Sequence, residues 1–214
     1  MAIVKTSAST REISDGELNR FRIDEASSDH IISVLTHAYS RPQFSSLREV
    51  FQNGLDADPS KPIDVTMPTA ANPVLEVRDY GPGLSAQGFR DMIGSVGASD
   101  KRGDASKAGC LGIGSLAPMS VLDSMTMTSF QGGQMTVLHI YKEDDGKLAY
   151  TVSDTKPAKK TEKNGMLVSM PVPPDMFGAF AAGLNVFKFS PRLCKRIRVD
   201  GVPVCEWDAQ ALRR

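Results

Sequence analysis

The order of the hydrophobic patterns along this chain is the feature that most restricts its fold. Helical spacing comes first, and it predicts helices over residues 27–39 and 44–57. Alternating, β-rich segments come mainly later, and they predict strands at residues 62–67, 74–79, 124–130, 135–141, 147–153 and 166–171. Helices followed by a strand meander predict an α+β fold, a two-layer sandwich with helices on one face of a mixed, mainly antiparallel sheet.

Shorter segments complete this prediction. Residues 86–93 and 175–184 have helical spacing, and a further helix is expected to begin beyond Gly114. Asp200-Gly201 predicts a hairpin turn between the strands 196–199 and 202–205. Two polar stretches are predicted as surface loops, of which the first is mobile: residues 94–109 and 155–164.

The expected organisation is one compact domain with two short appendages. We divide the chain into an N-terminal segment 1–24, a domain 25–187 and a C-terminal hairpin or tail 188–214. The tail would be the start of a missing domain if the chain is an excised piece, and otherwise the end of a small stand-alone protein.

Charge and hydropathy exclude several classes of partner. The 25 Lys and Arg residues balance the 25 Asp and Glu residues, so no overall field attracts nucleic acid or an anionic membrane. The apolar run 177–187 is shorter than the roughly 20 residues of a membrane span, and the N-terminus has no apolar secretion signal. We therefore expect a cytoplasmic protein, located in the host cytoplasm if it is phage-encoded. The three cysteines form no CxxC pair, which disfavours a disulfide framework and a zinc site.

The second predicted helix carries a first candidate motif. Glu49, Asn53 and Asp56 follow at i, i+4 and i+7, so they share one stripe opposite the apolar one. A solvated polar face is the simpler interpretation. Gly54 suggests that this helix also packs closely against another segment. Glycine inside a helix costs about 1 kcal/mol relative to alanine, and such a cost is expected where a side chain would not fit.

A second motif follows the strand 74–79. Asp79 continues the apolar row of Leu75 and Val77, so its carboxylate needs hydrogen-bond donors if it is buried. Gly81 and Gly83 allow close approach of the main chain to whatever Asp79 holds. An ordinary turn capped by aspartate explains this stretch equally well.

The third motif is a glycine run, Gly109-x-x-Gly112-x-Gly114, which opens a predicted helix. Backbone N–H groups exposed by glycines at a helix N-terminus can bind an anion. The order differs from the dinucleotide fingerprint and from the P-loop, so both of these are disfavoured.

In this order and at these separations, the three motifs resemble the GHKL superfamily, which includes DNA gyrase B, the ninety-kilodalton heat-shock chaperone, histidine kinases and MutL. The resemblance covers residues 25–172. It implies the Bergerat ATP-binding fold, binding of ATP with Mg²⁺, slow hydrolysis, and lid closure as a conformational switch. It also implies homodimerisation on ATP binding and an unidentified protein client, as in the chaperone and MutL branch. The N-terminal domains of phage rIIA-type proteins are a further fit.

The resemblance assigns roles to matching residues. Glu49 would be the general base, and Asn53 would hold Mg²⁺. Asp79 would accept a hydrogen bond from the adenine amino group. Residues 94–109 would be the lid. The remaining positions implied at the nucleotide are Asp56, Gly81, Gly83, Gly109, Gly112 and Gly114.

Two positions leave alternatives open. Lys101 resembles a lid lysine that approaches the phosphates, although a solvated loop lysine is an equal interpretation. Met166 occupies the place of a threonine that usually supports the adenine-binding aspartate through water, so the base contact could be weaker or rearranged.

Two other functions stay open beside an ATPase. A non-catalytic, nucleotide-sensing interaction module would fit Met166. A protein kinase of the same superfamily fits less well, because histidine kinases commonly carry asparagine where this chain has Glu49, and no helix with a phosphoacceptor histidine precedes it.

Overall fold

The computed structural model describes residues 5–6, 9–10, 19–22, 40–97 and 113–208. The helix predicted at residues 27–39 lies outside these residues, as does the predicted loop from residue 98 onward.

The described strands form one large sheet and a small separate hairpin. The large sheet has the order β12-β11-β4-β5-β10-β6-β7-β8-β3, and β9 pairs with β7. Among these strands β11 and β4 run parallel, and the other pairs are antiparallel. The strands are β3 (Asn19–Arg22), β4 (Ile63–Thr66), β5 (Val74–Arg78), β6 (Ser124–Gln131), β7 (Gln134–Lys142), β8 (Leu148–Val152), β9 (Lys156–Pro157), β10 (Gly165–Pro171), β11 (Ile197–Val199) and β12 (Val202–Pro203).

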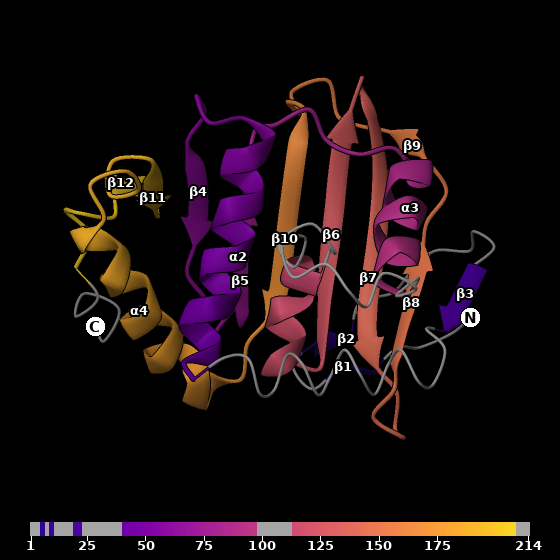
Figure 1. Cartoon of the computed structure of the whole chain (residues 1–214), viewed down its shortest axis with the longest axis horizontal. Helices are drawn as coiled ribbons and strands as arrows, with labels where there is room; N and C mark the ends of the chain where they lie inside the picture. Colours follow the sequence, from indigo (N-terminus) through magenta and orange to yellow (C-terminus); the bar gives the residue numbers. More distant parts are fainter. Residues whose placement is uncertain (1–4, 7–8, 11–18, 23–39, 98–112, 209–214) are drawn as a thin grey trace, which may run out of the picture.

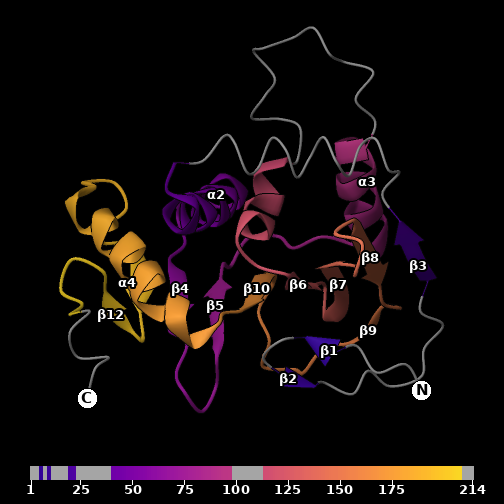
Figure 2. The ribbon, with the colours of Figure 1, turned by 90° about the horizontal axis from the view of Figure 1, so that it is seen from below.

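The helices α2, α3 and η2 cover one face of this sheet, as Figures 1 and 2 show. The small hairpin of β1 (Lys5–Thr6) and β2 (Ser9–Thr10) lies on the opposite side. This arrangement confirms the predicted two-layer α+β sandwich with a mixed, mainly antiparallel sheet. The helices are α2 (Pro42–Ala57), α3 (Ala86–Gly97), the 3₁₀ helix η2 (Ile113–Ser120), η3 (Pro174–Met176), α4 (Phe177–Asn185) and η4 (Val186–Phe189).

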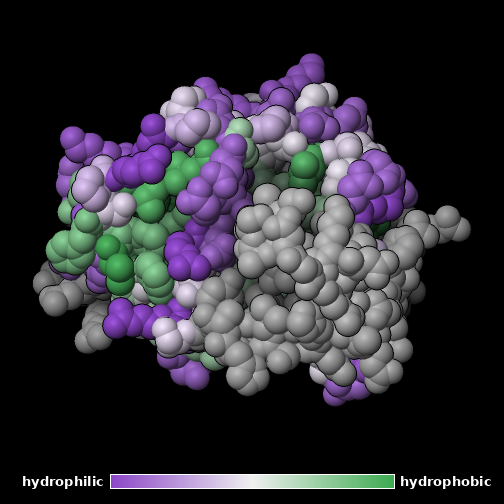
Figure 3. All heavy atoms as spheres, viewed as in Figure 1, coloured by the Kyte–Doolittle hydropathy of each residue, from purple (hydrophilic) through white to green (hydrophobic). Residues whose placement is uncertain are grey.

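The predicted apolar stripe of α2 faces the core. Leu47 and Phe51 are fully buried, and Phe44 and Leu55 pack partly against the same core. The opposite face of α2 is a band of hydrophilic residues in Figure 3, and it carries Arg48, Gln52, Asn53 and Asp56. Core contacts therefore fix which side of α2 the polar motif presents.

Some boundaries differ from prediction. Helix α2 begins at Pro42, two residues early, because the fixed φ of proline suits the first helical turn. Residues 94–97 belong to α3, so their assignment to the mobile loop was wrong. The segment after residue 112 forms a 3₁₀ helix that includes Pro118. Strands β3 and β9 were not predicted.

The segment 188–214 contributes the predicted hairpin around Asp200 and Gly201, which both have positive φ. Its first strand, β11, joins the main sheet beside β4. No helix in the described ranges is long and apolar enough to cross a membrane.

Candidate functional site

Asp79 lies at the end of β5, in a turn that is hydrogen-bonded to the start of β10. Its Oδ1 accepts hydrogen bonds from the Gly81 N–H (2.9 Å) and the Met166 N–H (3.1 Å). The Asp79 N–H in turn donates to the Met166 carbonyl (2.9 Å). The two backbone N–H groups on Oδ1 therefore orient the Asp79 side chain, and Oδ2 has no donor among the described residues.

Burial is the largest influence on the Asp79 carboxyl group and raises its pKa. The two N–H donors and the nearby Arg78 oppose this change, but the pKa stays above its ordinary value. A carboxylate kept in such a costly position is a candidate functional group.

Two glycines allow α2 to pack directly against the Asp79 turn. A Cβ at Gly54 would lie 3.1 Å from the Asp79 Cβ, and a Cβ at Gly81 would lie 2.7 Å from the Ala57 Cβ. The glycine inside α2 is thus explained by close packing, as the sequence suggested. These contacts bring the buried side of α2, near its C-terminal end, against Asp79.

Two further glycines allow the Asp79 turn to pack closely against the neighbouring strands β6 and β10. Gly83 has φ +75°, and a Cβ there would overlap the Phe130 carbonyl oxygen. Gly165 has φ +133°, and a Cβ there would overlap the Asp79 carbonyl oxygen. Sequence reasoning assigned no role to Gly165, although a glycine immediately before an apolar strand is a signal of close backbone approach.

Arg78 also contacts the Asp79 turn and the residues that precede β10. Its guanidinium lies between the rings of Tyr80 (4.9 Å) and Phe130 (4.8 Å). It donates to the Asp79 carbonyl and to the Lys163 carbonyl (2.5 Å), so it ties the Asp79 turn to the approach of β10.

Met166 acts here through its backbone. Its side chain is buried in the core, while its N–H and C=O both bond to Asp79. The Met166 main chain therefore holds Asp79 without any contribution from the Met166 side chain.

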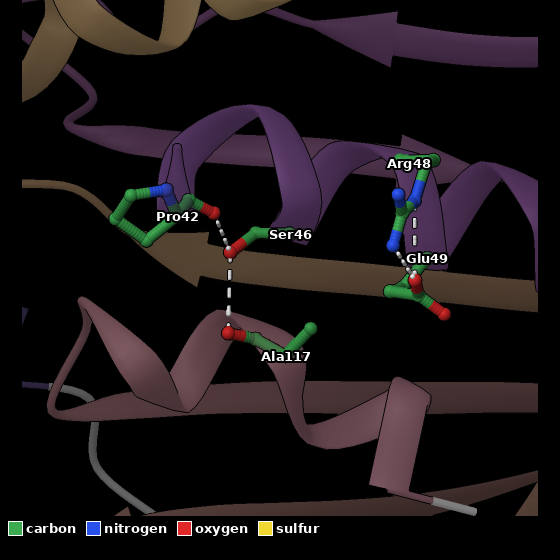
Figure 4. Close-up of polar contacts among 5 residues, drawn as sticks. All are labelled: Pro42, Ser46, Arg48, Glu49 and Ala117. Atoms are coloured by element: carbon green, nitrogen blue, oxygen red, sulfur yellow. Dashed lines mark hydrogen bonds and ion pairs between the residues drawn. The ribbon is translucent and has the colours of Figure 1, made fainter. Parts of the chain in front are cut away.

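Glu49 lies one helical turn before Asn53 on α2, against the start of η2. Its Oε1 accepts from Arg48 Nη2 (2.6 Å) and Nε (3.2 Å), as Figure 4 shows. A Cβ at Gly114 would lie 2.6 Å from Glu49 Oε2. The carboxylate therefore lies over a glycine of η2. Arg48 directly precedes Glu49 in the chain, so this ion pair lies within one turn of α2.

The other polar residues of α2 point outward. Asn53 is exposed, and Asp56 accepts a hydrogen bond from Gln52 (2.6 Å). Of the glycine run, the structure describes Gly114, whereas Lys101, Gly109 and Gly112 lie outside the described residues.

The described residues contain no cluster of three or more His, Cys, Asp or Glu that could hold a metal on its own. Mg²⁺ bound with a nucleotide needs only one or two protein oxygens, since phosphates and water supply the rest. The exposed Asn53 amide provides such an oxygen, so this position fits Mg²⁺ bound with a nucleotide.

Comparison with known proteins identifies one family. The family model described as histidine kinase-, DNA gyrase B-, and HSP90-like ATPase matches residues 39–166, more than half of the chain. This range contains α2, the Asp79 turn, η2 and the start of β10. A search of curated proteins found no match.

Proposed function

Because the chain belongs to the histidine kinase-, DNA gyrase B- and HSP90-like ATPase family, we propose that it binds ATP with Mg²⁺ and hydrolyses it slowly to ADP and phosphate. One observation carries the proposal. Asp79, whose Oδ2 has no donor among the described residues, packs against α2 at Gly54, and Glu49 of the same helix lies over Gly114 of η2.

At the base end, Asp79 Oδ2 would accept a hydrogen bond from the adenine amino group. The backbone bonds to Oδ1 fix the direction of Oδ2 before the base arrives, which reduces the ordering cost of binding. Gly81 and Gly83 would let the base lie close to the main chain.

At the phosphate end, Gly114 would contribute a backbone N–H, together with Gly109 and Gly112 by family resemblance. Asn53 would hold Mg²⁺ through its amide oxygen, and the ion supplies charge neutralisation on the phosphates when bound. Lys101 is our candidate for a lid contact, and residues 98–109 would form the lid that closes over ATP.

Glu49 would be the general base. Its carboxylate would take a proton from the attacking water as the water oxygen bonds to the γ-phosphorus and the bond to the ADP oxygen breaks. Its pairing with Arg48 must loosen for this, and both side chains are partly exposed, at 50% for Arg48 and 23% for Glu49, so the pair is a weak restraint.

Titration of a non-hydrolysable ATP analogue, with and without Mg²⁺, tests binding. We expect Mg²⁺-dependent binding by wild type and about 10- to 100-fold weaker binding by Asp79→Asn, which loses a charged acceptor. Asp145→Asn on the β7–β8 turn is the matched control and should bind as wild type does. No wild-type binding at millimolar analogue would refute the proposal.

A turnover assay tests hydrolysis. Glu49→Ala should retain the analogue affinity and lose turnover by at least about 100-fold. Equal turnover by wild type and Glu49→Ala would refute the role of Glu49.

A non-catalytic nucleotide sensor is the second candidate. The observation that favours it is the Arg48–Glu49 pair, in which two guanidinium N–H groups donate to Glu49 Oε1. Wild-type binding without turnover would support the sensor. Size-exclusion chromatography with the analogue would also test ATP-dependent homodimerisation in either case.

A further inference from the structure

Ser46 connects α2 to η2 inside the core. It has no exposed surface, and its Oγ lies 2.7 Å from the Pro42 carbonyl oxygen and 3.2 Å from the Ala117 carbonyl oxygen. Figure 4 shows both contacts, one within α2 and one across to η2. A hydroxyl has one hydrogen, so Ser46 shares it between a local acceptor and one that is 71 residues away in the chain.

The acceptor in η2 has two hydroxyl partners. Ala117 is fully buried, and its carbonyl also accepts from Ser120 Oγ (2.7 Å) within η2. Buried carbonyls need a partner. Ser120 already provides that partner within η2. The bond from Ser46 is therefore not needed to satisfy the Ala117 carbonyl oxygen, and its distinct effect is to link α2 to η2.

The two cross-contacts between α2 and η2 follow one register. Ser46 meets Ala117, and Glu49 meets Gly114. Moving three residues forward along α2 corresponds to moving three residues back along η2, about one turn in each helix. The apolar contacts between these helices are non-directional, whereas a hydrogen bond prefers one alignment.

A change of register would alter the site. Sliding η2 by one residue would bring Ile113 or Ser115, each with a side chain, to the place where Gly114 now leaves room for the Glu49 carboxylate. Ser46 lies about one helical turn before Glu49 on α2, and its hydrogen bond to Ala117 opposes such a slide of η2.

We propose that Ser46 is a positioning residue, whose hydroxyl sets the register of η2 against α2 and so keeps Gly114 beneath Glu49. This inference rests on the proposed ATPase function for its kinetic consequence. It adds a residue that touches neither the nucleotide nor Mg²⁺.

Ser46→Ala and Ser120→Ala form a matched pair, because each removes one hydroxyl from the Ala117 carbonyl and only the bond from Ser46 joins α2 to η2. We expect Ser46→Ala to lower kcat roughly fivefold, the equivalent of one neutral hydrogen bond. The affinity for adenosine should stay unchanged, since adenosine contacts only the Asp79 end. Ser120→Ala should keep the wild-type kcat.

Ser46→Cys separates the hydrogen bond from the volume of the side chain. Sulfur fills the space of the hydroxyl oxygen but is a weak donor. This variant should therefore lose kcat as Ser46→Ala does. A wild-type kcat in Ser46→Cys would mean that filling the space is enough, and would overturn the proposal.

Other outcomes also overturn it: an unchanged kcat in Ser46→Ala, equal losses in both alanine variants, or a loss of adenosine affinity parallel to that of kcat. If wild type shows no turnover, the proposed hydrolysis fails, and hydrogen exchange still tests the register. Ser46→Ala should then raise exchange at the amides of residues 114–117 more than Ser120→Ala does, and equal exchange would refute the role of Ser46.

Discussion

The two ends of the candidate site are built differently. Around Asp79, the glycines meet backbone or Cβ atoms: Gly81 meets the Ala57 Cβ, and Gly83 and Gly165 meet carbonyl oxygens. Around Glu49, the three described atoms nearest to a Cβ at Gly114 all belong to the Glu49 side chain. The base end is therefore fixed by parts of the molecule that cannot move independently, and the phosphate end by the tip of a flexible side chain.

This difference matches the separate roles proposed for the two ends, recognition of the base at Asp79 and proton transfer at Glu49. Recognition of a rigid base benefits from a site that is ordered before binding. A general base must approach the water in the reacting complex, and its contacts often tighten only there. The comparison predicts that a methyl group added to a glycine at the Asp79 end lowers the stability of the fold. A methyl group added to Gly114 at the Glu49 end should instead lower turnover.

Gly165→Ala should have the largest effect, because it places a methyl group against the Asp79 carbonyl at a positive φ. We expect a loss of about 3 kcal/mol or more in the free energy of unfolding, measured with urea. Gly146→Ala is the control, since Gly146 also has positive φ but no atom near its Cβ position. Its cost should be about 1 kcal/mol. Equal losses would contradict the idea of a rigid base end.

Gly114→Ala should separate chemistry from stability. Gly114 does not have a left-handed φ, and the added methyl group would displace only the Glu49 carboxylate. We expect the free energy of unfolding to change by less than about 1 kcal/mol and turnover to fall at least about tenfold. Adding Gly114→Ala to Glu49→Ala should cause no further loss of turnover. A destabilisation as large as that of Gly165→Ala would show that both ends are equally rigid.

Asp79→Asn should give the smallest change, a gain in stability without ligand. A raised pKa means that protonation of Asp79 favours the folded state. This contribution is fully present below the unfolded-state pKa of 3.8 and is lost as the pH rises through the folded-state pKa. Asparagine keeps an oxygen for Gly81 and Met166 without the buried charge. The free energy of unfolding in urea should therefore be higher for Asp79→Asn than for wild type at about pH 7, and this difference should shrink towards about pH 4. A variant less stable than wild type at both values would contradict this.

The elements that position the site were predictable because their patterns are local. The apolar stripe of α2 and the alternation of β5 each fix a buried face, and that face determines where Glu49 and Asp79 point. Even the closeness of another segment to Gly54 could be inferred, since glycine is costly inside a helix.

The parts that were missed depend on neighbours distant in the sequence. Gly165 matters because of the Asp79 carbonyl, and Ser46 because of the Ala117 carbonyl, and neither contact leaves a periodic trace. Strand β3 has four residues and is recognisable only by its pairing with β8.

The parallel pairing of β11 with β4 has a consequence for how this protein folds. Residues 63–65 of β4 pair with residues 197–199, so one edge of β4 lacks this partner until residue 199 has been synthesised. Contacts of such long sequence separation form slowly, and an unpaired strand edge can pair with another chain in the meantime. Strand β11 thus protects the β4 edge beside the helix that carries Glu49, and aggregation during synthesis competes with the pairing of β11 and β4.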